Sequence, residues 1–187
     1  GEVPGLTKRT PAPPRRGRYT PRMDRLALFC DTQNLYYAAR DGFDAHVDYA
    51  TLQRAATDGR TLAHANAYVV ERDGERGAYG FVTKLSALGY RVHRRAVRVH
   101  RTSDAGTPEL EGDWDMGIAA DMVRAEPHVD VVVLASGDGD FVPIVRLLQE
   151  RGVRIEVVAF RAATAQDLID ACDRFTDLGE VEGAFVG

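Results

Sequence analysis

The fold is decided by the stretch Val131-Val132-Val133-Leu134-Ala135-Ser136-Gly137-Asp138-Gly139-Asp140-Phe141. Its first five residues form a short apolar run, which is typical of a strand covered on both faces of a parallel sheet. Glycines and acids follow at once, a pattern typical of a strand end that turns into a helix. In open α/β sheets, ligands bind at the carboxyl ends of the strands. We therefore predict that Asp138 and Asp140 lie where the chemistry takes place.

Two other places in the chain repeat this pattern of an apolar element edged by acids. The apolar run Leu26–Cys30 ends at Asp31, and Asn34 follows three residues later. The segment Asp113-Trp114-Asp115 opens a helical pattern that continues to Arg124. Acidic sites at three element edges predict a divalent-metal site, because hard cations prefer carboxylate oxygens.

From residue 25 onward, apolar runs of strand length alternate with segments of helical periodicity. Strands are predicted at 26–30, 62–70, 90–99, 129–135 and 153–159, and helices at 34–40, 49–57, 77–88, 115–124, 141–150 and 163–171. Strands separated by helices imply parallel pairing through right-handed crossovers. The sequence thus predicts a doubly wound α/β domain, with a mainly parallel sheet of five or six strands and helices on both faces.

The first 24 residues differ from the rest of the chain. Residues 1–25 carry seven basic and two acidic side chains, although the whole 187-residue chain has a formal net charge of −4. The segment is also rich in proline and holds almost nothing to bury, so we expect a disordered basic tail over 1–24 and the α/β domain over 25–187. Two interpretations stay open for the tail: it holds a polyanion near a site, or it is a solvated linker.

Several classes are excluded by composition. No apolar run approaches the roughly 20 residues that span a bilayer, so a membrane protein is not expected. Cys30 lies inside an apolar strand and Cys172 is far away in sequence, which favours reduced thiols and a cytoplasmic protein. The five histidines show no metal-ligand spacing, so a zinc site is not expected.

Three motifs carry a resemblance to a known family. Asp31-Thr32-Gln33-Asn34 resembles the D-x-x-N opening of NYN domains, the LabA-like branch of the PIN-like ribonuclease superfamily. Gly112-Asp113-Trp114-Asp115, with Asp121 six residues on, resembles their central K-G-x-x-D…D block. Ser136–Phe141 matches their S-G-D-x-D-F signature. One position departs from the pattern, because Glu111 stands where many relatives carry lysine.

The resemblance implies a metal-dependent endoribonuclease with Mg²⁺ or Mn²⁺ as cofactor. Its first-rank ligands are Asp31, Asp115 and Asp138, and Asp140 is expected to hold a second metal or to orient water. Asn34 is expected to contact phosphate or to position Asp31. RNA is the expected partner, with DNA as the alternative. Further candidates are Ser136, as a donor to a ligand, and Asp113 and Asp121.

Each of these acids also has a purely structural interpretation. Asp31, Asp113 or Asp115, and Asp138 are all suited to cap a helix that follows them. Asp121 lies about 240° around its helix from Asp115, so it does not automatically face the same point. Trp114 is interpreted as a packing residue, with base stacking as the alternative.

The strand at 90–99 is strongly basic, which is typical of an edge strand protected from further pairing. We nevertheless predict that arginines in or beside the loops after this strand and the one at 62–70 bind RNA phosphates: Arg72, Arg76, Arg98 and Arg101.

Two other functions compete with the nuclease. The first is a catalytically inactive RNA-binding or regulatory domain of the same fold. The second is a phosphatase of the haloacid dehalogenase type, suggested by Gly137-Asp138-Gly139. That family needs a second aspartate two residues after its nucleophile, and Gln33 occupies that position here. The phosphatase is therefore set aside.

Overall fold

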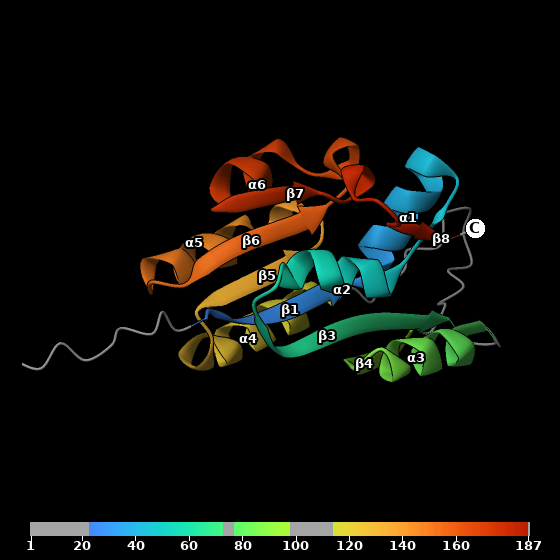
Figure 1. Cartoon of the computed structure of the whole chain (residues 1–187), viewed down its shortest axis with the longest axis horizontal. Coiled ribbons are helices and arrows are strands. Elements are labelled where there is room, and N and C mark those ends of the chain that lie inside the picture. Colours follow the sequence, from blue (N-terminus) through green and yellow to red (C-terminus); the bar gives the residue numbers. More distant parts are fainter. Residues whose placement is uncertain (1–22, 73–76, 98–113, 187) are drawn as a thin grey trace, which may run out of the picture.

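The computed structural model describes residues 23–72, 77–97 and 114–186. Its centre is a six-stranded sheet in the order β4-β3-β1-β5-β6-β7, in which every neighbouring pair is parallel (Figure 1). The strands are β1 (Arg25–Asp31), β3 (Thr61–Arg72), β4 (Tyr90–Val97), β5 (Val131–Ala135), β6 (Arg154–Ala159) and β7 (Arg174–Asp177). The prediction of a doubly wound parallel α/β sheet is confirmed.

Helices connect these strands and cover both faces of the sheet. They are α1 (Thr32–Phe43), α2 (Tyr49–Thr57), α3 (Gly77–Ala87), α4 (Asp115–Ala125), α5 (Val142–Glu150) and α6 (Gln166–Ala171). A small antiparallel pair, β2 (His46–Val47) with β8 (Phe185–Val186), lies beside α1 (Figure 1). None of the helices in the described ranges is long and apolar enough to cross a membrane.

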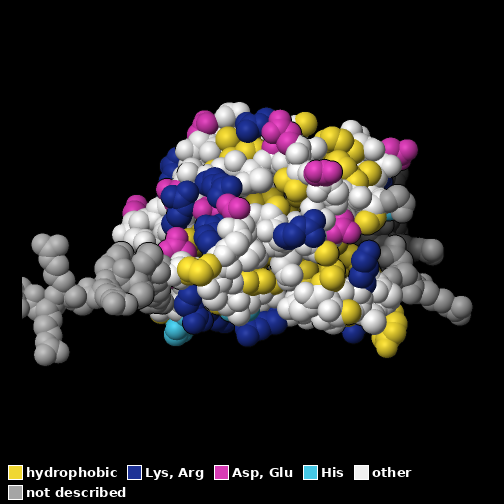
Figure 2. All heavy atoms as spheres, viewed as in Figure 1, with side chains coloured by type: hydrophobic (Ala, Val, Ile, Leu, Met, Phe, Trp, Pro, Cys, Tyr) yellow, Lys and Arg dark blue, Asp and Glu magenta, His cyan; other side chains and the backbone are white. Residues whose placement is uncertain are grey.

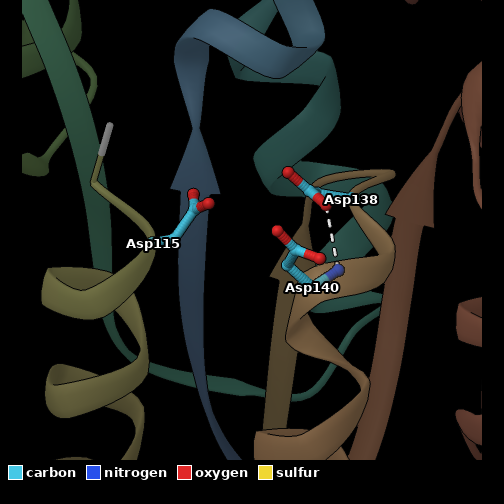
Figure 3. Close-up of side chains that lie close together, drawn as sticks. All are labelled: Asp115, Asp138 and Asp140. Atoms are coloured by element: carbon cyan, nitrogen blue, oxygen red, sulfur yellow. Dashed lines mark hydrogen bonds between the residues drawn. The ribbon is translucent and has the colours of Figure 1, made fainter. Parts of the chain in front are cut away.

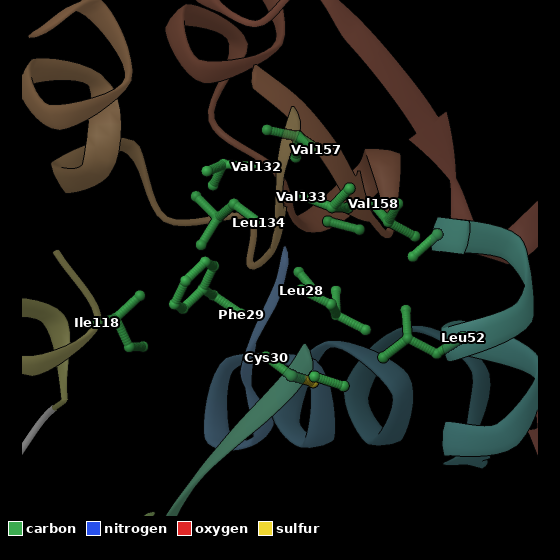
Figure 4. Close-up of a cluster of buried hydrophobic side chains, with 14 of the residues drawn as sticks. Leu28, Phe29, Cys30, Leu52, Ile118, Val132, Val133, Leu134, Val157 and Val158 are labelled. Carbon is green, nitrogen blue, oxygen red and sulfur yellow. The ribbon is translucent and has the colours of Figure 1, made fainter. Parts of the chain in front are cut away.

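The hydrophobic core has two halves, one on each face of the sheet. Successive side chains of a central strand point to opposite faces and so contribute to both halves. In β1, Phe29 faces Ile118 of α4, whereas Leu28 faces Leu52 of α2 (Figure 4). All four side chains are fully buried or nearly so. Cys30 is fully buried in the same strand, as its place in an apolar run predicted.

Local capping signals explain where the helices begin. Asp48 caps α2, because its carboxylate accepts a hydrogen bond of 2.7 Å from the backbone N–H of Thr51. This bond, which outweighs the effect of partial burial, lowers the pKa of Asp48. Asp31 caps α1 in the same way through the N–H of Asn34.

Three details differ from the sequence prediction. The sheet gains β7, which the sequence analysis did not predict because Arg174–Asp177 is short, polar and only partly buried. The β2–β8 pair was also missed, since two-residue strands carry no periodicity. Finally, α6 begins at Gln166 rather than at residue 163, because Arg161–Ala163 forms a separate 3₁₀ turn. Strand β4 lies at the sheet edge, as predicted.

Candidate metal centre

The candidate site lies where the order of the strands reverses. After β1 the chain builds β3 and β4 on one side of β1, and then crosses through α4 to build β5, β6 and β7 on the other side. Cys30 at the end of β1 pairs with Ala135 at the end of β5. Asp31 and Ser136, the next residues of the two strands, therefore emerge side by side at the switch point, where open α/β sheets bind their ligands.

Three carboxylates converge at this edge. Asp115, Asp138 and Asp140 each offer one oxygen, and the three oxygens lie within 4.8 Å of one another. Figure 3 shows Asp115 on the first turn of α4, pointing toward Asp138 and Asp140 in the loop after β5. Asp115 and Asp138 are half-buried, whereas Asp140 is exposed. The structure therefore brings together three of the four predicted metal ligands.

This arrangement has the chemistry of a cation site. Carboxylates so close together repel one another unless a positive charge lies between them. Hard divalent cations such as Mg²⁺ and Mn²⁺ are bound by a few carboxylates, and water or substrate oxygens complete the coordination. Asp115 and Asp138 are the partly buried members, so they have the most fixed surroundings, and Asp140 is open to solvent.

The fourth predicted ligand, Asp31, lies next to this cluster but is not one of its three members. It is only 9% exposed. Its Oδ1 accepts from the backbone N–H of Asn34 at 3.1 Å, and its Oδ2 accepts from the hydroxyl of Ser136 at 3.1 Å. The Ser136 oxygen in turn accepts from the backbone N–H of Asp138 at 3.3 Å. Ser136 thus links the carboxylate of Asp31 to the backbone of a cluster member.

The loop that carries Asp138 is held from two sides. The side-chain oxygen of Asn34 accepts a hydrogen bond of 2.9 Å from the N–H of Gly137. On the other side, the Gly137 carbonyl accepts from the N–H of Ala165 at 2.9 Å. A Cβ at position 137 would lie 2.5 Å from the carbonyl oxygen of Ala163, so only glycine fits here. The D-x-x-N motif and the S-G motif are therefore joined by hydrogen bonds from both of their polar residues.

The start of α4, and with it Asp115, is anchored by Trp114. The indole N–H donates to the carbonyl of Val69 at 3.1 Å, and the ring packs edge-on against Tyr68. The ring also lies over Gly117, where a Cβ would approach it to 2.7 Å. The guanidinium of Arg95 lies over the Trp114 ring, 4.5 Å from the ring centre. Trp114 is thus a packing residue in the structure.

Asp121, the family-based candidate, is used elsewhere. One carboxylate oxygen accepts from the Tyr68 hydroxyl at 2.8 Å, and the other from Arg124 at 2.7 Å. Burial, and then the hydrogen bond to Asp121, raises the pKa of Tyr68. Asp121 is outside the three-carboxylate cluster.

Several predicted residues lie outside the described part of the chain. These are Asp113, Arg76, Arg98 and Arg101, together with the tail up to residue 22. Arg72 is the last residue of β3, and its side chain is outside the described residues as well.

One acid beside the site was missed by the sequence analysis. A carboxylate oxygen of Asp167 lies 3.2 Å from the point where a Cβ would stand on Gly139, between Asp138 and Asp140. Asp167 is exposed in the first turn of α6. The available signal was an acid near a helix start, the same signal that Asp115 gives on α4.

Comparisons with known proteins give a consistent picture. The family model described as "NYN domain" matches residues 25–179. The chain is 30% identical over 162 residues to the low amplitude and bright protein LabA of Synechococcus elongatus, covering 86% of this chain and 87% of LabA. A crystal structure of a protein of unknown function from Vibrio parahaemolyticus is similar with a TM-score of 0.75 at 29% identity, covering 89% of this chain and 98% of that one.

Proposed function

The chain belongs to the NYN domain family, and from this premise we propose that it is a divalent-metal-dependent endoribonuclease. The observation that carries the proposal is the convergence of Asp115, Asp138 and Asp140 at the switch point of the sheet. The resemblance of the three sequence motifs to nucleases of the PIN-like superfamily supports the same activity. The proposed cofactor is Mg²⁺ or Mn²⁺, because the donors are carboxylates only.

The chemistry required is hydrolysis of a phosphodiester bond. A bound divalent cation would supply a polarised phosphoryl oxygen and a water of lowered pKa. Asp115 and Asp138 are the proposed ligands with the most fixed surroundings. Asp140 is open to solvent, where its carboxylate can orient the attacking water or accept its proton.

Residues around the cluster position the loop that carries Asp138 and Asp140. Asn34 holds the loop through Gly137, and Ser136 holds Asp31 against the same loop. We propose Asp31 as a positioning residue, and its contact with the metal would be through metal-bound water rather than by direct ligation. Such outer partners orient ligands, and their loss typically costs 10- to 100-fold in metal affinity or activity.

RNA is the proposed substrate, and DNA is the alternative polyanion. The predicted phosphate contacts from Arg72, Arg76, Arg98 and Arg101, and from the basic tail over residues 1–24, remain part of the proposal. These contacts can be tested by varying the salt concentration, because each phosphate contact makes RNA affinity fall more steeply with salt.

A second candidate function is an RNA-binding domain that does not cut. One observation favours it: Asp31, a predicted ligand, accepts two hydrogen bonds from the protein and is not among the three clustered carboxylates. A site with fewer ligands holds a cation less tightly. Such a domain would bind RNA without hydrolysing it.

The test is cleavage of end-labelled single-stranded RNA with Mn²⁺, with Mg²⁺ and with EDTA. We expect cutting only with metal, and its loss in Asp138→Asn while RNA binding is retained. Asp170→Asn, which changes an exposed acid of α6, is the matched control and should cut like the wild type. RNA binding with no cutting under any of these conditions would establish the second candidate instead.

A further inference from the structure

A pocket of about 540 Å³ opens at the same end of the sheet as the metal centre. It lies among α1, α2, α3, the β2–β8 pair and the last residues of β3. Its walls include Thr32, Tyr36, Tyr37, Arg40, His46 and Lys84. Its volume is in the range of pockets that bind small molecules or cofactors.

The pocket adjoins the metal centre through the start of α1. Thr32, one of its wall residues, directly follows Asp31 in the chain. The Thr32 hydroxyl is fixed by donating to the carbonyl of Tyr68 at 2.7 Å. Asp31 is in turn joined through Ser136 to the loop that carries Asp138, so the start of α1 links the pocket to the metal centre.

The walls combine aromatic rings with positive charge. Three tyrosines and a phenylalanine contribute rings, and Arg40 and Lys84 contribute cations. The Arg40 guanidinium lies 4.7 Å from the ring centre of Tyr37 and 5.7 Å from that of Tyr36. Tyr36 is also stacked on His46, with 6.0 Å between ring centres. Arg40 forms a surface ion pair with Asp41, which is not a wall residue.

These features match the chemistry of a nucleotide. Aromatic faces stack on bases, and arginine or lysine neutralises the adjoining phosphate. No carboxylate is among the wall residues, so nothing in the described lining repels an anion. Figure 2 shows the face that carries α2, where basic side chains lie beside hydrophobic ones, with acidic side chains among them.

We propose that this pocket binds one base, with its phosphate, of a single-stranded RNA whose neighbouring phosphate lies at the metal centre. The proposal rests on the ribonuclease function proposed above and adds a subsite to it. Tyr36 is the stacking residue, because 43% of it is exposed in the free protein, and Lys84 binds the phosphate.

The first test measures binding without cleavage. Fluorescein-labelled single-stranded RNA is titrated in EDTA and followed by anisotropy. Tyr36→Ala should weaken binding roughly 5- to 150-fold, which is the range for the loss of one base stack. Tyr79→Ala, which removes an exposed tyrosine of α3 outside the pocket, is the control and should bind like the wild type. Equal affinities of all three proteins would overturn the proposal.

The second test identifies the base in the pocket. A set of RNAs, each with one abasic position, is bound to the wild type and to Tyr36→Ala. One abasic position should weaken wild-type binding and have no further effect in Tyr36→Ala, since both changes remove the same stack. If every abasic effect adds fully to that of Tyr36→Ala, no base occupies the pocket and the proposal is wrong.

Failure of the nuclease and failure of the subsite are distinguishable in this design. Binding is measured in EDTA, so a protein that does not cut still reports on the pocket. Lys84→Gln should lower the slope of log affinity against log salt by about one phosphate contact relative to Arg146→Gln, a control at an exposed position of α5. Tighter binding of a single nucleoside monophosphate than of the RNA would overturn the RNA subsite in favour of a nucleotide site.

Discussion

The side chain of Asn34 accepts a hydrogen bond of 2.9 Å from the backbone N–H of Gly137. This bond joins the first turn of α1 to the loop after β5, two segments that are 103 residues apart in the chain. It runs beside the bond between Asp31 and Ser136, so two adjacent strand ends are clasped together immediately before Asp138. The loop that carries Asp138 is therefore positioned by side chains outside the three-carboxylate cluster.

Asn34→Ala should loosen this clasp. The Gly137 N–H loses its acceptor in a partly buried site, which costs about 1–3 kcal/mol in the free energy of unfolding. The cleavage rate should fall as well, because the loop that carries Asp138 is less fixed. Urea unfolding and single-turnover RNA cleavage measure the two effects. An Asn34→Ala variant that is as stable and as active as the wild type would contradict the role of the acceptor.

Gly117→Ala should disturb Asp115 through Trp114. The new Cβ would lie 2.7 Å from the indole ring, and the ring is fixed by its bond to Val69, so the start of α4 must shift. Overpacking of this kind lowers the free energy of unfolding by about 1–3 kcal/mol. The better helix propensity of alanine offsets up to about 1 kcal/mol of this loss. The temperature of thermal unfolding and the affinity for Mn²⁺ should both decrease.

Gly42→Ala is the matched control for that substitution. Gly42 is also a helical glycine, in α1, but nothing lies within 4 Å of its Cβ position. The substitution should therefore raise stability by about 0.5–1 kcal/mol. If Gly117→Ala stabilises the protein as Gly42→Ala does, Trp114 does not constrain the start of α4.

The ion pairs of Glu156 should make stability depend on pH. Burial alone would raise the pKa of Glu156, but hydrogen bonds from Arg60 and Arg154 outweigh it and hold the pKa below its usual value near 4.5. Because the pKa is lower in the folded protein, the stabilisation is fully present above about pH 4.5 and is lost as the pH falls through the folded-state value.

Glu156→Gln removes this contribution. At neutral pH the variant should be less stable than the wild type by roughly 1.5–3 kcal/mol, because hydrogen bonds from two arginines to a buried carboxylate are lost. The difference between the two proteins should shrink as the pH drops below about 4.5. Urea denaturation across this range provides the measurement. A difference that stays constant from neutral to acidic pH would show that Glu156 acts by packing alone.

Local signals in the sequence were enough for most of the fold. Asp48 caps the start of α2, as expected for an aspartate before a helical pattern. Gly89, with a φ of +88°, follows the end of α3, as expected for a glycine after a helical pattern. The apolar runs of β1 and β5 are buried along their lengths. Strand β7 was not predictable in this way, because its four residues gain their place from pairing with β6 rather than from periodicity.

The site was predictable in its residue types but not in its grouping. The acids at strand ends and helix starts were identified, yet which oxygens meet depends on how α4 packs against β1 and β5. Asp31 is equally well placed in sequence, and its bonds to Asn34 and Ser136 are formed only in the tertiary structure. The aromatic pocket was missed for a similar reason, since Tyr36, Tyr37 and Tyr49 look like core residues of their helices.

Asp115, Asp138 and Asp140 are proposed to form one divalent-cation site. Titration of Mn²⁺ into the protein, with free Mn²⁺ followed by electron paramagnetic resonance, tests this site without any assumption about the substrate. We expect saturable binding by the wild type and by Asp170→Asn, and at least a tenfold loss of affinity in Asp115→Asn and in Asp138→Asn. Binding of equal affinity in all four proteins, or none in the wild type, would contradict this proposal.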